Sequence, residues 1–106
     1  MENIQEKDWK IARSLKDKVL NLACGRILDK ISVITHRDNT NHEKFLDVWD
    51  VLHRENDDIA LMFDGFRRST AIHQISLWKR NGLLTDEDLS SFSLETQGII
   101  CKISEL

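Results

Sequence analysis

The stretch from Asn56 to Leu84 limits the folds open to this chain more than any other segment does. Its apolar residues recur at the 100° spacing of a helix, which predicts one long helix through the whole stretch. One side of that helix forms an ordinary core stripe of Ile59, Met62, Phe63, Phe66, Thr70, His73 and Leu77. We therefore expect this helix to lie at the centre of a helical bundle.

The opposite side of the same predicted helix is also apolar. A helix that is apolar on two sides either lies centrally in its own bundle or meets another subunit. A chain this short has few further helices to cover that second side. The predicted subunit interface therefore consists of Leu61, Arg68, Ile72, Ile75 and Trp78.

The composition favours a small number of long helices. The 106 residues include no Pro and only four Gly, whereas sandwiches and barrels need many turns. The length fits one domain, over residues 1–106. We predict an all-α, single-domain bundle of four to five helices with a long central helix.

Capping residues and loop formers set the predicted helix boundaries. The polar loop His36–Asn41 separates the first helix from the second, for which Asn41 or Thr40 is the expected N-cap with Glu43 in the first turn. Gly82 ends the central helix, and Thr85 and Ser93 begin the last two. A break at Asn56–Asp58 is favoured, although the apolar stripe also fits a continuous helix. The expected helices are Ile4 or Asp8 to Ile34, His42–Glu55, Asn56–Asn81, Thr85–Phe92 and Leu94–Ile103.

Several features predict a cytoplasmic protein without a membrane segment. The longest apolar run is three residues, far below the length that spans a bilayer, and the first ten residues are too polar for a secretory signal. Cys24 and Cys101 are expected as reduced thiols, with a single disulfide as the alternative.

Charge is spread unevenly along the chain. Residues 1–37 carry a net charge of +3 and residues 38–106 carry −6. The simplest interpretation is that the two halves neutralise each other, with a basic arm for an acidic partner as the alternative. A related alternative is an acidic inhibitor or immunity-type protein that binds a basic partner through Asp57, Asp58 and Asp86–Asp88.

No motif for catalysis or metal binding stands out. The paired Glu-x-x-His motifs of di-iron bundles and the HExxH zinc motif are both missing from the sequence. The loop residues His36, Asp38 and His42 form a weak candidate metal site, and solvated loop residues explain them more simply. We predict no catalytic residue, no metal and no cofactor.

His73 is the strongest candidate for a ligand-binding residue. It falls on the predicted core stripe one turn after Thr70, where it could serve as a base or ligand inside a bundle pocket. A neutral, hydrogen-bonded core histidine is the simpler interpretation. A ligand- or metal-binding bundle centred on His73 and Thr70 therefore stays as an alternative.

Nucleic acid is not an expected partner. Residues 77–92 have a helix–turn–helix pattern, but the second helix opens with Asp86–Asp88, which phosphates would repel. No motif points to a known family, so the residues alone carry the interpretation. They favour a non-catalytic protein-interaction module that acts as a homodimer or binds another protein.

Overall fold

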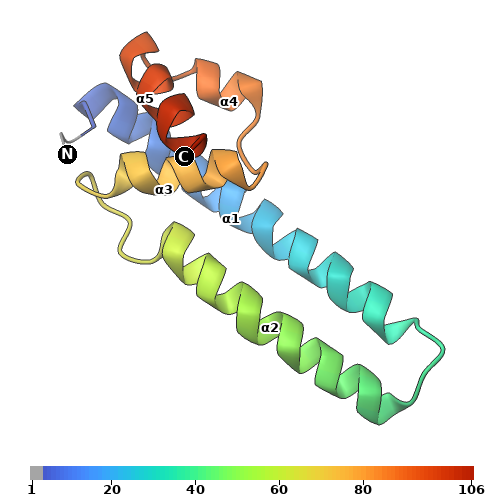
Figure 1. Cartoon of the computed structure of the whole chain (residues 1–106). Coiled ribbons are helices and arrows are strands. Elements are labelled where there is room, and N and C mark those ends of the chain that lie inside the picture. The colour runs from blue at the N-terminus through green and yellow to red at the C-terminus, as the bar shows by residue number, and fades with distance from the viewer. Residues whose placement is uncertain (1–3) are drawn as a thin grey trace.

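The computed structural model describes residues 4–106 and confirms the all-α prediction. Within these residues it contains five helices and no strands (Figure 1). The helices are α1 (Glu6–Thr35), α2 (Asn41–Phe63), α3 (Ala71–Arg80), α4 (Asp86–Ser90) and α5 (Leu94–Ser104).

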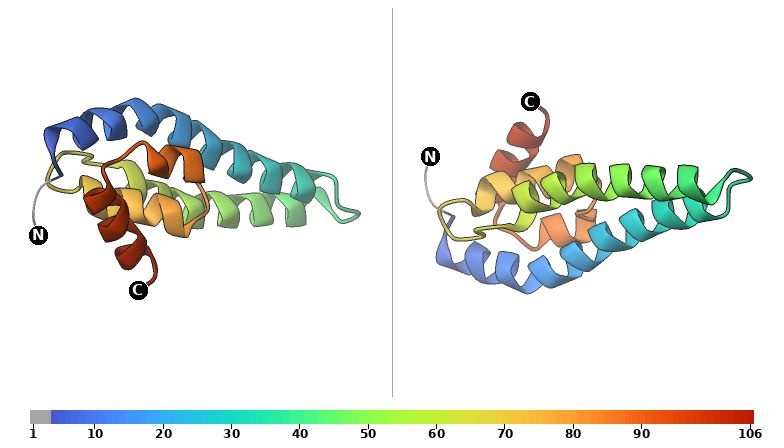
Figure 2. Two further views of the ribbon diagram at one scale, coloured as in Figure 1. Left: turned by 90° about the horizontal axis from the view of Figure 1, so that it is seen from above. Right: turned by 90° about the horizontal axis from the view of Figure 1, so that it is seen from below.

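The molecule is elongated because α1 and α2 form a long antiparallel hairpin. Helices α3, α4 and α5 gather at the end of the hairpin that carries both termini, and the other end projects away from them (Figures 1 and 2). The described residues measure 52 × 25 × 24 Å, with a radius of gyration of 16.3 Å. A compact domain of this length has a radius of gyration of about 13 Å.

The tip of the hairpin has the capping signal that the sequence predicts. The Thr40 hydroxyl accepts a hydrogen bond from the backbone N–H of Glu43 at 3.1 Å, and the Glu43 carboxylate accepts one from the Thr40 N–H at 3.2 Å. This reciprocal pair satisfies two N–H groups that a helix start otherwise leaves open. It fixes the start of α2 directly after the loop.

The predicted break at Asn56–Asp58 is wrong, because α2 continues through these residues to Phe63. Asn and Asp lower helix propensity by only about 0.7 kcal/mol each relative to Ala. All three side chains are exposed to water, where they cost nothing in packing. The stripe through Leu52, Ile59 and Phe63 keeps its register, so the helix continues.

The prediction that Asn56–Leu84 forms one helix is also wrong. Helix α2 ends at Phe63, Asp64 is extended, and Gly65 has a φ of +60° that residues other than glycine rarely adopt. The chain then turns through residues 64–70 and starts α3 at Ala71. An Asp-Gly pair is a turn signal, which the uninterrupted apolar spacing concealed.

Side chains of α3 hold the end of α2. The indole Nε1 of Trp78 donates to the carbonyl of Met62 at 3.0 Å, and the Gln74 amide donates to the carbonyl of Asp64 at 2.9 Å. The last carbonyls of a helix have no partner within it. These two hydrogen bonds supply partners and fix the fold-back of α3.

Nearly all of the core lies at the end where α3 and α5 pack on α1. We call this region the packed end, comprising residues 4–20 and 62–106. Its aromatic side chains pack in series, with ring centroids 5.6 Å apart for Phe63 and Trp78, 5.3 Å for Phe66 and Trp78, and 5.2 Å for Trp9 and Phe66. Trp78 lies at the centre and is fully buried.

Asp8 joins the first turn of α1 to the start of α5. Its buried carboxylate accepts hydrogen bonds from the Ser93 N–H at 2.8 Å and from the hydroxyls of Ser93 and Thr96 at 2.7 Å each. Burial raises the pKa of Asp8, but the hydrogen bonds from Thr96 and Ser93 outweigh it and hold the pKa below its ordinary value. The ionised carboxylate therefore anchors α5.

The turns around α4 confirm the sequence signals for that region. Gly82 adopts a φ of +69° just after α3, and the Thr85 hydroxyl accepts from the backbone N–H of Asp88. Asp88 is also paired with Lys18 of α1 at 2.8 Å. Within residues 4–106, no helix combines the length and apolarity needed to cross a bilayer.

Candidate functional site

Three of the five predicted interface residues belong to the chain's own core. Ile72 is 5% exposed, and Ile75 and Trp78 are completely buried, so the prediction that they form a subunit interface is wrong. The reason is the turn at residues 64–70, which folds α3 back so that α1, α2 and α5 cover its apolar side. The prediction assumed one straight helix and too few further helices in the chain to cover its second side.

The other two predicted interface residues lie apart from each other. Leu61 is exposed near the end of α2. Arg68 lies in the turn before α3, where its Nε donates to the carbonyl of Ile4 at 2.8 Å and its guanidinium lies 3.8 Å from the Glu6 carboxylate. Arg68 thus holds the N-terminal segment in place. An interface role for Leu61 or Arg68 stays a prediction.

The two candidate ligand-binding residues are not brought together. His73 is exposed on α3, so the prediction that it lies on the core face is wrong. Thr70 organises the preceding turn, where its hydroxyl accepts from the Arg67 N–H at 3.1 Å and lies 2.7 Å from the side-chain oxygen of Gln74. Thr70 therefore has a local structural role.

The loop candidates for metal binding also remain dispersed. His36 Nδ1 lies 2.7 Å from the carbonyl of Ser32. Across residues 4–106, no three His, Cys, Asp or Glu side chains converge as metal ligands would. Cys24 and Cys101 are free thiols.

The acidic residues named for a basic partner are only partly available. Asp57 and Asp58 are exposed on α2, and Asp86 and Glu87 are exposed on α4. Asp88 is buried. Burial raises its pKa, but the hydrogen bonds from Lys18 and Thr85 and the charge of Lys18 outweigh it and hold the pKa below its ordinary value. The Asp88 carboxylate is therefore used within the fold, and only Asp86 and Glu87 of this cluster are available to a partner.

The largest unpartnered surface is on the projecting part of the hairpin. Among residues 4–106, fourteen apolar side chains are buried, and only one of them, Ile34, lies between residues 24 and 61. Seven of the ten large hydrophobic side chains that are exposed in this part of the chain lie in the same segment. Two helices alone cannot bury their apolar stripes completely, so this part of the fold leaves apolar surface in contact with water.

One side of the hairpin carries most of this surface, and we call it the hairpin face. It comprises Cys24 and Leu28 from α1 and Phe45, Leu46, Trp49, Leu52 and His53 from α2, all of them exposed. Helical spacing places these α2 residues on adjoining sides of one helix. Phe45 and Trp49 protrude most among the aromatic side chains, with exposed fractions of 64% and 57%.

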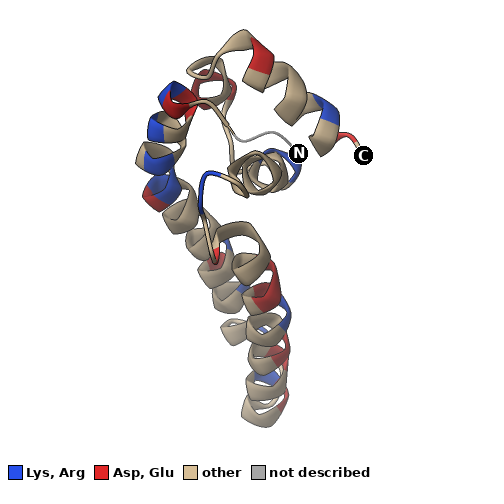
Figure 3. Ribbon diagram, turned by 90° about the vertical axis from the view of Figure 1, so that its left-hand side faces the viewer, with Lys and Arg blue, Asp and Glu red and all other residues tan. Residues whose placement is uncertain are grey.

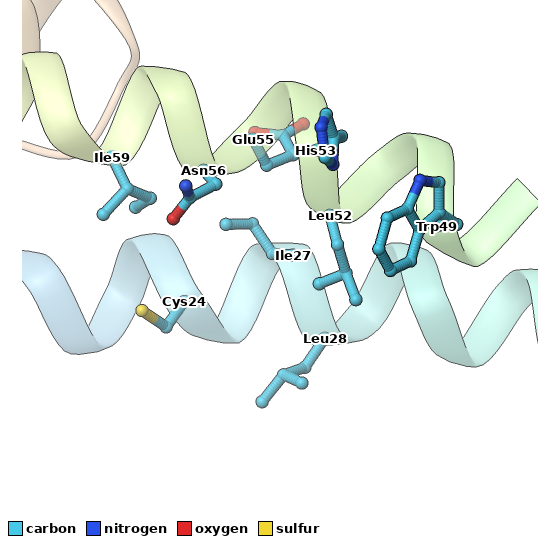
Figure 4. Close-up of a pocket in the computed structure, with 9 residues that line it drawn as sticks. All are labelled: Cys24, Ile27, Leu28, Trp49, Leu52, His53, Glu55, Asn56 and Ile59. Atoms are coloured by element: carbon cyan, nitrogen blue, oxygen red, sulfur yellow. The ribbon is translucent and has the colours of Figure 1, made fainter.

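An open hollow of about 470 Å³ runs along this face between the two helices. Figure 4 shows its lining, with α1 contributing the smaller side chains and α2 contributing Trp49 and Leu52. The Trp49 and His53 rings stack with their centroids 5.3 Å apart, which supports the indole from one side. The lining residues are Cys24, Ile27, Leu28, Trp49, Leu52, His53, Glu55, Asn56 and Ile59.

The seven residues of the hairpin face include no Lys, Arg, Asp or Glu, and Glu55, the charged residue that lines the hollow, is paired with Lys30 on the opposite, charged side of the hairpin. That other side carries Arg26 and Lys30 from α1 beside Glu55 and Asp58 from α2, with an ion pair between Lys30 and Glu55. Figure 3 shows the charged segments of the hairpin gathered mainly along one edge, with the other edge largely uncharged. The two sides of the hairpin therefore differ in charge.

The apolar spacing of residues 42–55 places Phe45, Trp49 and Leu52 on one face of the second helix, but it does not show that this face is exposed. The missed signal was the excess of apolar residues on both helices, more than one helix–helix contact can cover. No family model, curated protein or solved structure matches this chain.

Proposed function

We propose that this protein is a non-catalytic protein-interaction module that forms a homodimer through the hairpin face. The observation that carries the proposal is the concentration of exposed apolar side chains between residues 24 and 61, where the chain buries almost none. The cytoplasm is the expected compartment, in keeping with two free thiols.

The size of the face suits a subunit interface. Two aromatic and three leucine side chains, each about half exposed, present on the order of 600 Å² of apolar surface. That is at the upper limit for the largest apolar patch of a monomer. Two such faces together would bury about 1,200 Å², the lower end of the range for specific, stable complexes.

The chemistry of the face also suits an interface core. Interface cores are depleted in charged residues and enriched in aromatic ones, and polar groups surround them. Phe45 and Trp49 protrude from an area where the only charged lining residue, Glu55, is paired with Lys30, and the other charged side chains, Arg26 and Asp58, lie on the other side of the hairpin. Burying this area would leave no unpaired charge.

A second copy of the chain is the partner that fits best. A two-fold interface needs protruding and hollow parts on the same surface, so that each copy supplies what the other accepts. The hairpin face has both, in the protruding Phe45 and Trp49 and in the hollow beside Cys24 and Leu28. Two hairpins packed face to face form a four-helix bundle, which closes the apolar stripes that two helices leave open.

Two matched substitutions test this proposal. Phe45 and Leu61 are 64% and 67% exposed on the same helix. Sixteen residues separate them, which places them about 160° apart around the helix axis. We expect Phe45→Glu to convert the dimer to a monomer in light scattering, because a carboxylate would be buried in the interface. Leu61→Glu should leave the dimer intact.

The far-ultraviolet circular dichroism of both variants should match that of the unmodified chain, since both positions are exposed. Equal dimer formation by the two variants would contradict the hairpin face as the interface. Loss of the dimer only in Leu61→Glu would place the interface on the other side of α2 and restore the role that the sequence predicted for Leu61.

A further inference from the structure

We infer that the two hairpins of the dimer point in the same direction, tip beside tip, with α2 of each copy packed on α1 of its partner. This inference rests on the proposed function and specifies how the second copy is recognised. It follows from the different sizes of the side chains that the two helices contribute to the hairpin face.

The α2 half of the face is bulky and the α1 half is small. Helix α2 exposes five large side chains on this side, Phe45, Leu46, Trp49, Leu52 and His53. Helical spacing places five exposed residues of α1 on the same side, Asn21, Cys24, Leu28, Ser32 and Thr35. Only Leu28 among these is large, so the face is a ridge beside a shallow groove.

Two kinds of two-fold axis can bring such faces together. An axis along the bundle keeps both tips at the same end and places α2 of one copy over α1 of the other. An axis perpendicular to the helices reverses the second hairpin, so that the tips lie at opposite ends. It places α1 over α1 and α2 over α2. The two arrangements therefore match the ridge and the groove differently.

Only the first arrangement places the ridge of one copy in the groove of the other. Trp49 and Leu52 line the same hollow as Cys24 and Leu28, so these residues lie at one level along the hairpin. An axis along the bundle preserves that level. It therefore seats Trp49 of each copy above Cys24 and Leu28 of the other, and it covers the hollow of both.

The end-to-end arrangement packs the faces less well. It sets the bulky side chains of α2 against those of the second α2, which holds the helices apart. The small residues of the two α1 helices then face each other across a gap. Protein interiors pack at the density of organic crystals, and such a gap loses the dispersion contacts of the side chains around it.

The net charges of the helices favour the same arrangement. In the projecting hairpin, residues 21–35 of α1 carry two Lys/Arg against one Asp/Glu, a net charge of +1, and α2 carries two against six, a net charge of −4. With tips together, every helix of the bundle has only oppositely charged neighbours. With hairpins end to end, each helix lies beside one of like charge.

The distance between the two tips distinguishes these arrangements. Asp38 is exposed in the tip loop, and replacing it with a ketone-bearing amino acid allows a spin label to be attached without altering Cys24 or Cys101. Pulsed electron paramagnetic resonance then measures the distance between the two labels of the dimer. The same label in the Phe45→Glu chain is the control, and it should give no defined distance.

We expect a tip-to-tip distance of about 20 Å or less, because helices within a bundle lie 8–10 Å from their neighbours. A distance of about 30 Å or more in a confirmed dimer would overturn the tip-together arrangement and leave the homodimer standing, since Trp49 lies eleven residues from Asp38 at roughly 1.5 Å per residue. A monomeric mass without a defined distance would overturn both proposals.

Discussion

Two tryptophans in this chain show how its two ends differ. Trp78 at the packed end is completely buried, and its indole N–H donates to the carbonyl of Met62. Trp49 on the hairpin is 57% exposed and has the His53 ring on one side. Both side chains belong to apolar stripes of amphipathic helices. What separates them is the number of helices nearby.

At the packed end, α3 and α5 add two further layers to the hairpin and close the core. Beyond Arg26 of α1, whose guanidinium donates to the carbonyls of Asn81 and Gly82, the hairpin has only its own two helices to bury two apolar stripes. The same amphipathic pattern can therefore produce either a closed core or an interaction surface. The outcome depends on whether the chain supplies enough helices at that place.

The two ends should differ most in how far the free energy of unfolding falls when each tryptophan is replaced by alanine. We expect Trp78→Ala to lower the free energy of unfolding by about 3–5 kcal/mol, because it empties a buried aromatic site and leaves the Met62 carbonyl without its partner. Trp49→Ala should cost about 1 kcal/mol or less in the monomer. Urea unfolding in the Phe45→Glu background measures both without a contribution from the dimer.

Trp78→Phe keeps most of the buried volume, and it provides a milder measurement if Trp78→Ala does not fold. Equal costs at positions 78 and 49 in the monomer would contradict the division into a packed end and an unpartnered hairpin.

Asp8, which anchors α5, should make the stability of the packed end depend on pH. We expect Asp8→Asn to lower the free energy of unfolding by about 1–3 kcal/mol, because the buried carboxylate accepts three hydrogen bonds. Folding lowers the pKa of Asp8. Its contribution to the free energy of unfolding is therefore fully present above the pKa that Asp8 has in the unfolded chain. It is lost as the pH falls through the folded pKa, below about pH 4.

Urea unfolding at several pH values checks this prediction, and Asp8→Asn should reduce the loss of stability in that acid range. A variant with the same acid dependence as the unmodified chain would show that Asp8 does not hold the packed end together as an anion.

Alanine substitutions at two glycines should have the smallest effects on stability, and these effects should be of opposite sign. Gly82 has a φ of +69°, so Gly82→Ala should destabilise the chain by about 1 kcal/mol or more. Gly98 lies within α5 with open space around its Cα, so Gly98→Ala should stabilise the chain by up to about 1 kcal/mol. Thermal unfolding of the two variants measures both, and a stabilised Gly82→Ala chain would contradict the turn that separates α3 from α4.

The sequence predicted the elements of this fold well where the signals are local. Thr40, Gly82, Thr85 and Ser93 each mark a helix boundary through a hydrogen bond or a backbone angle that the residue itself provides. Such signals need no knowledge of the rest of the chain. The all-α class follows from them and from the apolar spacing.

The candidate site was predicted poorly because it depends on tertiary packing. The spacing of apolar residues across Asp64-Gly65 is the same for a straight helix as for two helices that fold back on each other. Placing Trp78 in the core or on the surface requires knowledge of that turn. The exposure of Phe45 and Trp49 depends equally on where α3 and α5 pack, which spacing along one helix does not encode.

Sedimentation equilibrium of the unmodified chain measures whether two copies associate. We expect a mass of twice the 12.4 kDa of a single chain at high protein concentration, with dissociation on dilution. Dissociation should be accompanied by increased exposure of Trp49 in fluorescence quenching. A mass of 12.4 kDa throughout the concentration range would contradict the hairpin face as a self-association surface.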